Sequence, residues 1–403
     1  MKNIRANSFF NFVACLFLAL IVPCQMLSAE GIENKFEVVD GRIDLKGWQG
    51  DTPISLVGNW RFAPGIVDPG TIAALDNDGD IQLQPINTSL VRSGLDELKG
   101  GQGGMTFHLL LNGVEAINSL SMQMVADTSY AVYLFKDQQQ PIRVGGLGLV
   151  EADIDNNIPQ LGNQLSRLQL AGQGNYHLVI QVQNRVYSDG GIWVTPTITR
   201  YDLGYDRWHF AHISETLAIG IIFILTFYNL SLFFQRREET AYLWLSCYCL
   251  MTLARLISTS GYFLSSFVPE PMEAVYQWQR IFEYVSPALI AASFVAFLIR
   301  SFYPGQYLRL SRCFYGICFA SVIAVALPLD PVLFISIVVQ PLMLLSITLC
   351  MFLSVRAVWN QKIGARYVLI GIIVYSMTII HDILVAIAVL PDSFFMTHFG
   401  ACF

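Results

Sequence analysis

The sequence is poor in charged residues, which make up 13% of its 403 positions, whereas hydrophobic residues make up 54%. Cysteine is missing between positions 30 and 207, so a domain in that region needs a core of its own in place of disulfides. A Walker motif, a nucleophile elbow, a metal-binding cluster and a kinase signature are all missing too. We therefore predict a chain without catalytic activity, cofactor or bound metal.

The few charges are distributed unevenly along the chain. Residues up to about 205 have an ordinary soluble composition, and apolar runs dominate from about residue 208. This division is typical of a soluble domain fused to a membrane domain. Lys2 and Arg5, an apolar stretch over residues 9–22 and the small residue Ala29 together resemble a secretory signal peptide. We predict a signal peptide at 1–29, an exported domain at 30–205 and a membrane domain at 208–403, with an uncleaved N-terminal anchor as the alternative for the first segment.

The exported region has the two-residue period of β-strands. Within residues 176–183, one face of an extended chain carries Tyr176, Leu178, Ile180 and Val182. Three further runs are apolar and β-prone, at residues 54–62, 106–112 and 129–135. Glycine- and aspartate-rich turns separate the runs. Many short strands joined by such turns predict an all-β jelly roll or β-sandwich.

The predicted β domain is mildly acidic. Between residues 30 and 202 it has 20 acidic and 11 basic residues, without a basic patch, which excludes nucleic acid as an expected partner. The acidic turn at residues 76–80 departs from the order of an EF-hand loop. We interpret that turn as solvated rather than calcium-binding.

Several aromatic and polar residues of the β domain are candidates for binding a solute. Trp48, Trp60 and Trp193 have flat rings that can stack on a sugar, although most tryptophans in such domains belong to the core. Asn184 and Asp189 belong to a segment that is either a binding loop or a rigid connection between strands.

Six apolar stretches after residue 208 have about the length that a helix needs to span the bilayer. They cover residues 213–234, 242–264, 282–299, 313–327, 332–355 and 367–390. Pro287 and Pro341 lie inside two of them and are expected to kink the helices. A further apolar stretch begins at residue 394. We expect a seven-helix domain truncated in its seventh helix, with a half-inserted tail as the alternative.

Positive residues are concentrated in alternate loops of the membrane domain. The loops after the first, third and fifth helices contain Arg236, Arg237, Arg300, Arg309, Arg312, Arg356, Lys362 and Arg366. The only positively charged residue in the intervening loops is Arg280. Positive loops of membrane proteins face the cytoplasm. The β domain is therefore predicted to be periplasmic in a multi-pass protein of a bacterial inner membrane, as the signal peptide also predicts.

Four ionisable residues are predicted at membrane depth, where such groups are costly and usually face a partner or a cavity. Arg255 and Glu283 are expected to neutralise each other. His381 and Asp382 form either a proton relay or, as we prefer, a packing contact near the outer interface. These groups do not form a chain across all helices and the two halves are not repeats, so a pump or transporter is poorly supported.

The order of three groups of motifs resembles one family, the bacterial seven-transmembrane receptors with diverse intracellular signalling modules. The opening of that family's extracellular jelly roll is similar to residues 41–45 (GRIDL) and 56–62 (LVGNWRF). Its closing strands are similar to residues 180–184 (IQVQN) and 190–193 (GGIW). Its first two membrane helices are similar to the region with Gly220, residues 228–230 (YNL), Arg236 and Tyr242.

The resemblance implies a galactose-binding-like sensor domain for a small solute, with carbohydrate preferred, and helices that relay the signal to a cytoplasmic output module absent from this chain. Membrane lipid is an expected partner, and a homodimer or a cytoplasmic signalling partner stays open. The alternatives are a membrane transporter or channel, a non-signalling adaptor subunit, and an enzyme acting on envelope glycans through Glu151 and Asp153.

Overall fold

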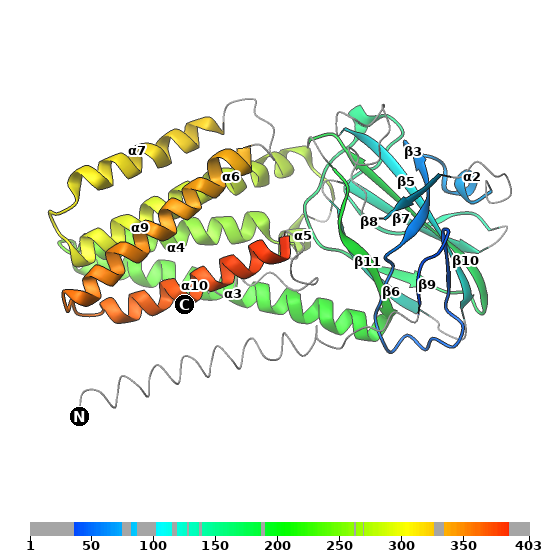
Figure 1. Cartoon of the computed structure of the whole chain (residues 1–403), viewed down its shortest axis with the longest axis horizontal. Helices are drawn as coiled ribbons and strands as arrows, with labels where there is room; N and C mark the ends of the chain where they lie inside the picture. Colours follow the sequence, from blue (N-terminus) through cyan, green and yellow to red (C-terminus); the bar gives the residue numbers. More distant parts are fainter. Residues whose placement is uncertain are drawn as a thin grey trace. The chain divides into compact units, whose positions relative to one another are not determined.

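The structure, a computed structural model, describes residues 36–74, 82–86, 102–114, 119–126, 129–136, 139–186, 190–261, 263–268, 270–325 and 334–386. Strands predominate in the described chain up to Arg200, with the short helix α2 (Pro69–Ala74) and a 3-10 turn among them, and long helices follow from Tyr201 (Figure 1). Residues 36–370 form one compact unit. Three predicted features lie outside the described residues: the signal peptide at 1–29, the acidic turn at 76–80 and the stretch from residue 394.

The β domain is a sandwich of two sheets, which confirms the predicted all-β fold. Among the described residues, the larger sheet has seven strands in the order β4-β3-β5-β10-β7-β8, and β1 pairs parallel with β5. Its strands are β1 (Arg42–Asp44), β3 (Asn59–Pro64), β4 (Gln82–Pro85), β5 (Gly103–Val114), β7 (Ser129–Lys136), β8 (Ile142–Leu147) and β10 (Gly174–Asn184). The smaller sheet has the order β2-β11-β6-β9, from β2 (Ile54–Ser55), β6 (Ser119–Ala126), β9 (Leu165–Gln169) and β11 (Ile192–Arg200).

The two-residue period of β10 correctly predicted which side chains face the core. Tyr176, Leu178, Ile180 and Val182 all belong to the large apolar cluster between the sheets. The opposite face of β10 is also covered, because Val179 is buried in a second cluster with two residues of the short helix α2 (Pro69–Ala74). A central strand buried on both faces is held by packing as well as by its backbone hydrogen bonds.

The predicted strand at residues 54–62 is divided in two by the structure. Its first part is β2 of the smaller sheet and its last part is β3 of the larger sheet. Gly58, between them, has a φ of +143° and lies so close to Val38 that a Cβ atom there would overlap the Val38 carbonyl oxygen. The chain therefore crosses between the sheets where a glycine permits the close approach.

Six long helices coincide with the six predicted apolar stretches. They are α3 (Tyr201–Gln235), α4 (Thr240–Thr259), α6 (Glu273–Phe302), α7 (Leu308–Ala324), α9 (Gln340–Trp359) and α10 (Ala365–Ala386). By length and composition, four spans among the described residues could cross a membrane: α3, α4, α6 and residues 337–359. A short helix, α5 (Phe263–Phe267), separates α4 from α6, and a π-helical turn (Ile335–Val339) precedes α9. Pro287 lies inside α6, whereas Pro341 occupies the first turn of α9, where a proline fits without a kink.

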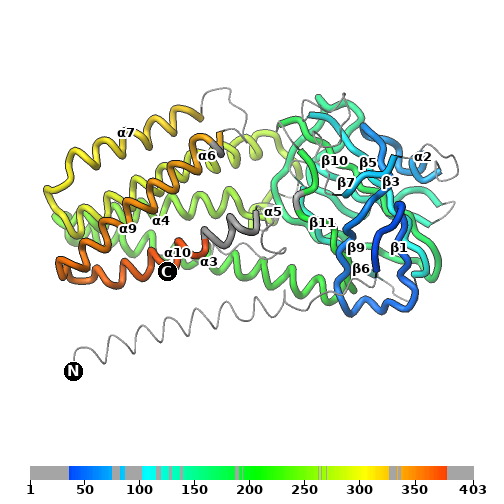
Figure 2. The backbone as a smooth tube through the Cα atoms, viewed as in Figure 1, coloured from blue at the N-terminus to red at the C-terminus, as the bar shows by residue number. Residues whose placement is uncertain are grey.

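The sandwich continues into the first long helix without a linker. Residues 201–209 form the first turns of α3, and the backbone passes from β11 directly into that helix (Figure 2). Gly204 lies against Ser121 of β6 so closely that a Cβ atom at that position would overlap the Ser121 hydroxyl. The Arg167 guanidinium of β9 lies 4.5 Å from the centre of the Tyr201 ring. The first turn of α3 is thus docked on the smaller sheet.

Candidate functional site

Two of the predicted ligand-binding residues are core residues. Trp60 is 0% exposed and Trp48 is 3% exposed, and both belong to the cluster between the sheets. Each indole N–H is satisfied within the domain: Trp60 Nε1 donates to the Leu56 carbonyl oxygen, and Trp48 Nε1 donates to that of Thr52, both at 3.0 Å. A ring with both faces packed cannot stack on a sugar, so the prediction of a stacking role is wrong for these two tryptophans.

The other ligand candidates are Asn184, which ends β10, and the later residues Asp189 and Trp193. Asn184 is fully buried, and its Oδ1 accepts a hydrogen bond of 3.1 Å from the Val186 amide. Gly190 lies directly against the Asn184 side chain. Asp189 and the Trp193 side chain lie outside the described residues. A ligand role for these three residues stays a prediction.

The polar residues predicted at membrane depth are only partly described. Arg255 Nη1 donates to the backbone carbonyl oxygen of Glu283 at 2.8 Å and to Ser286 Oγ at 3.2 Å. These two contacts tie α4 to α6 through the Glu283 main chain rather than through its carboxylate. His381 and Asp382 lie in α10, but their side chains are outside the described residues.

A buried carboxylate that the sequence analysis missed lies in α3. Glu215 is 8% exposed, and its Oε1 accepts hydrogen bonds from Ser260 Oγ and from the Phe263 amide, the latter at 3.3 Å. Ser260 follows α4 and Phe263 begins α5, so one side chain of α3 holds the turn between α4 and α5. An acid at the third position of an otherwise apolar predicted span was the signal that could have identified it.

One segment of the sandwich contacts the helices at several points. We call residues 157–164 the junction loop; it leads from the short 3-10 helix at Ile154–Asn156 to β9. Asn157 anchors it to the larger sheet, because its Nδ2 donates to the Leu149 carbonyl oxygen at 2.8 Å and to Gln183 Oε1 at 3.0 Å. Gln160 Oε1 accepts from the Gly148 amide at 3.1 Å. The loop is therefore fixed to the strands before it reaches the helices.

The junction loop meets the helices through its backbone. The Asn163 amide donates to the Gly261 carbonyl oxygen at 2.7 Å, and the Asn163 carbonyl oxygen accepts from Trp208 Nε1 of α3 at 3.4 Å. Gly162 and Gly261 face each other here, and a Cβ atom on Gly261 would lie 3.2 Å from Asn163 Cβ. Two glycines thus allow the two backbones to approach.

A salt bridge makes a second connection beside the junction loop. Arg185, which follows β10, places Nη2 3.0 Å from Glu273 Oε2 in the first turn of α6. Arg185 Nη1 also donates to the Asp155 carbonyl oxygen at 3.2 Å. Both charged side chains are partly exposed, at 31% and 42%. A salt bridge with this exposure contributes little to the free energy of unfolding, but it connects the end of β10 to the start of α6.

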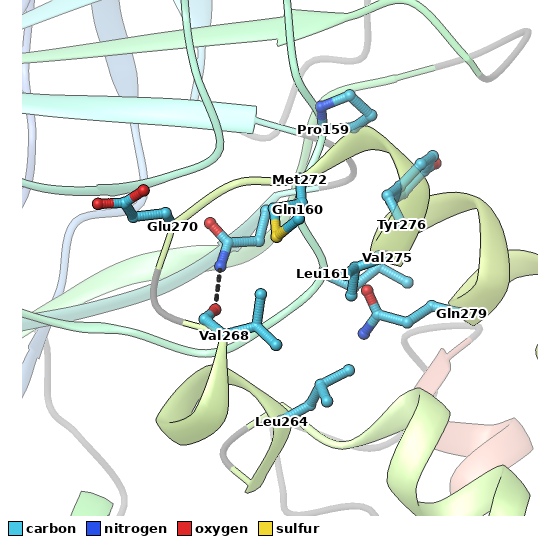
Figure 3. A pocket seen from close by; sticks show the side chains of 10 residues that line it. All are labelled: Pro159, Gln160, Leu161, Leu264, Val268, Glu270, Met272, Val275, Tyr276 and Gln279. Atoms are coloured by element: carbon cyan, nitrogen blue, oxygen red, sulfur yellow. Dashed lines mark hydrogen bonds between the residues drawn. The ribbon is translucent and has the colours of Figure 1, made fainter.

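A small depression lies where the junction loop faces α5 and α6 (Figure 3). It is lined by Pro159, Gln160, Leu161, Leu264, Val268, Glu270, Met272, Val275, Tyr276 and Gln279. Gln160 is one of the lining residues, and its Nε2 donates to the Val268 carbonyl oxygen at 3.5 Å (Figure 3). Its cavity volume is about 10 Å³, far below the range of about 300–1,000 Å³ that is usual for ligand pockets. The depression is thus a contact between elements and is too small for a sugar.

The helical part of the chain has relatives. Residues 212–403 match the family model described as 7TM diverse intracellular signalling. The helical part of the chain is therefore similar to the membrane domain of this signalling family. The match to the 7TM signalling family begins inside α3, after Trp208 and before Glu215, so the docked first turns of α3 precede the matched part. The family is one of signalling membrane domains and not of enzymes.

Other comparisons concern the fold. None of the curated proteins matches the chain significantly. A GH2 beta-galacturonidase from Eisenbergiella tayi, crystallised with glycerol, is similar to 37% of this chain at 12% identity and a TM-score of 0.25. A beta-glucuronidase from Faecalibacterium prausnitzii is similar to 34% of it at 17% identity and a TM-score of 0.24. The chain spans 24% and 21% of these enzymes, and the likeness concerns the sandwich fold alone.

Proposed function

We propose that this chain is a sensory receptor of a bacterial inner membrane whose sandwich lies in the periplasm and binds a small solute of the carbohydrate class. The family match supports a membrane sensory receptor, and the single observation that carries the relay is the backbone contact between Asn163 and Gly261. A solute that changes how the sandwich holds the junction loop would then change how the helices pack. A cytoplasmic signalling partner would receive that change.

The rigidity of the connections supports this proposal. Among the described residues, β11 passes directly into α3, and the anchored junction loop and the Arg185–Glu273 salt bridge add further connections to the helices. A ligand can shift an equilibrium only by its difference in affinity for the two states. Stiff contacts let a displacement in the sandwich reach the helices without being absorbed by a linker.

The orientation can be tested with introduced cysteines. Asp51 is exposed on the sandwich, and Lys362 is exposed between α9 and α10. We expect a membrane-impermeant thiol reagent to label Asp51→Cys in cells with a permeabilised outer membrane, and to label Lys362→Cys only after the inner membrane is opened. The parent chain, with its native cysteines, gives the background. The reverse labelling pattern would reject the proposed orientation.

The solute can be sought by thermal shift of the purified full chain against a panel of sugars. A ligand present at about 100 times its Kd stabilises a protein by about 2.7 kcal/mol, which is a measurable rise in Tm. Solute flux in liposomes would instead indicate a transporter. Capture of a protein without any sugar response would indicate an adaptor subunit.

A further inference from the structure

The turn between α4 and α5 is held from two sides. Its described residues are Ser260, Gly261 and Phe263. On one side, the Gly261 carbonyl oxygen accepts from the Asn163 amide of the junction loop at 2.7 Å. On the other side, the Glu215 carboxylate accepts from the Ser260 hydroxyl and from the Phe263 amide. The sandwich and α3 therefore act on the same short piece of backbone.

The contacts close into a ring because α3 takes part twice. Trp208 Nε1 donates to the Asn163 carbonyl oxygen, and Glu215 is seven residues further along the helix. Residues seven apart lie on one face of an α-helix. The ring runs from Trp208 to Asn163, then to Gly261 and Ser260, and returns to α3 through Glu215. A rotation or shift of α3 would disturb both of its contacts together.

The chemistry of Glu215 fits a positioning role. A carboxylate with an exposed fraction of only 8% needs hydrogen-bond donors, since burial of an unpaired charge is costly. The Ser260 hydroxyl and the Phe263 amide are two such donors, and both belong to the turn. The Ser260 hydroxyl oxygen also accepts from the Phe263 amide at 2.6 Å, which closes the turn on itself. The donors leave the carboxylate if the turn moves away, so burial of Glu215 opposes release of the turn.

We infer that Glu215 is the residue that holds the α4–α5 turn against the junction loop, so that the sandwich and α3 control one turn jointly. This inference rests on the proposed receptor function for its purpose, but the coupling itself needs no ligand. By thermodynamic linkage the coupling is reciprocal: loosening the turn from α3 loosens it from the sandwich, and the reverse.

Two backbone amides report the two sides separately. The Phe263 amide, which Glu215 Oε1 and Ser260 Oγ share as a donor, reports the closed turn on the side of Glu215, and the Asn163 amide reports the contact with Gly261. Hydrogen exchange at these amides is to be measured on the full chain in a membrane mimetic. In Glu215→Ala we expect exchange to accelerate about tenfold or more at both amides, because Ser260 Oγ and the Phe263 amide lose their shared buried acceptor.

The control is the neighbouring residue. Thr216 is exposed, and its hydroxyl donates only within its own helix, to the His212 carbonyl oxygen at 2.8 Å. Thr216→Ala should leave exchange at Asn163 and Phe263 unchanged. Glu215→Gln retains an acceptor oxygen of the same reach and should stay within about threefold of the parent at both amides.

The reciprocal variant is Gly261→Ala, whose methyl group would lie 3.2 Å from Asn163 Cβ and force the backbones apart. It should accelerate exchange at Phe263 as well as at Asn163. If Glu215→Ala does not fold, this variant and Ser260→Ala carry the test. The inference would be overturned if Glu215→Ala accelerated exchange at Phe263 but left the Asn163 amide unchanged. It would also be overturned if Gly261→Ala accelerated exchange at Asn163 but left the Phe263 amide unchanged. Either split leaves the solute and orientation experiments unaffected, so failure of the coupling can be told from failure of the receptor proposal.

Discussion

Acidification should weaken the sandwich through one buried histidine. His108 of β5 is fully buried, and its Nε2 lies 2.9 Å from Nδ1 of His177 on β10. Burial, followed by the charges of His177 and Arg61, lowers the pKa of His108 from 6.5 to about 3. The unfolded chain takes up a proton below pH 6.5 that the folded domain does not take up until about pH 3. Stability is therefore complete above pH 6.5 and declines as the pH falls toward 3.

The size of this effect follows from the two pKa values. A pH of 5 is about 1.5 units below the pKa of the histidine in the unfolded chain. At about 1.36 kcal/mol per unit, the free energy of unfolding falls by about 2 kcal/mol. In hydrogen exchange of the β10 amides this corresponds to a loss of protection of about thirtyfold between pH 8 and pH 5, after correction for the intrinsic rate.

His108→Gln tests whether this residue is the cause. The glutamine does not titrate, so its variant should have a flatter dependence of protection on pH than the parent chain. The full chain is used for both measurements. Equal slopes in the two proteins, or no loss of protection between pH 8 and pH 5 in the parent, would refute the assignment to His108.

Three further sets of substitutions test how the sandwich is built and joined to the helices. Gly204→Ala should cost about 1–3 kcal/mol by overpacking against Ser121, measured as loss of exchange protection in α3, and Ser121→Gly added to it should restore part of the loss. Asn157→Ala leaves buried acceptors unpaired and should cost about 2–3 kcal/mol in thermal unfolding, whereas a neutral result would contradict its anchoring role. Arg185→Ala and Glu273→Ala should each cost less than about 1 kcal/mol, and the effect should disappear at high salt.

Local patterns correctly predicted most elements but not how they meet. The period of two in residues 176–183 identified the buried face of β10, and the apolar stretches identified six helices, although α3 and α6 begin well before the predicted starts at 213 and 282. The run at 54–62 was predicted as one strand because β-propensity does not register a change of sheet. The chain passes between the two sheets at Gly58. Its close contact with Val38, which only the structure shows, explains why a glycine is needed there.

The candidate site could be predicted only in part. Aromatic type suggested Trp48 and Trp60 as ligand contacts, but burial depends on which strands pack together, and both residues belong to the core. Glu215 was passed over although a lone acid in an apolar run is a visible signal. Its partners Ser260 and Phe263 are 45 and 48 positions away, which a reading of local sequence does not connect.

The sequence by itself determined the division of the chain into a β-rich domain and an apolar helical domain. This follows because hydrophobic period and run length are local properties that solvent and lipid impose on each segment. Only the tertiary structure decided that the junction loop, the α4–α5 turn and α3 meet in one ring of contacts. The contacts of Gly162, Gly261, Asn163 and Glu215 form only because the fold brings distant backbone segments together. That proximity depends on the packing of the whole unit and not on the local sequence.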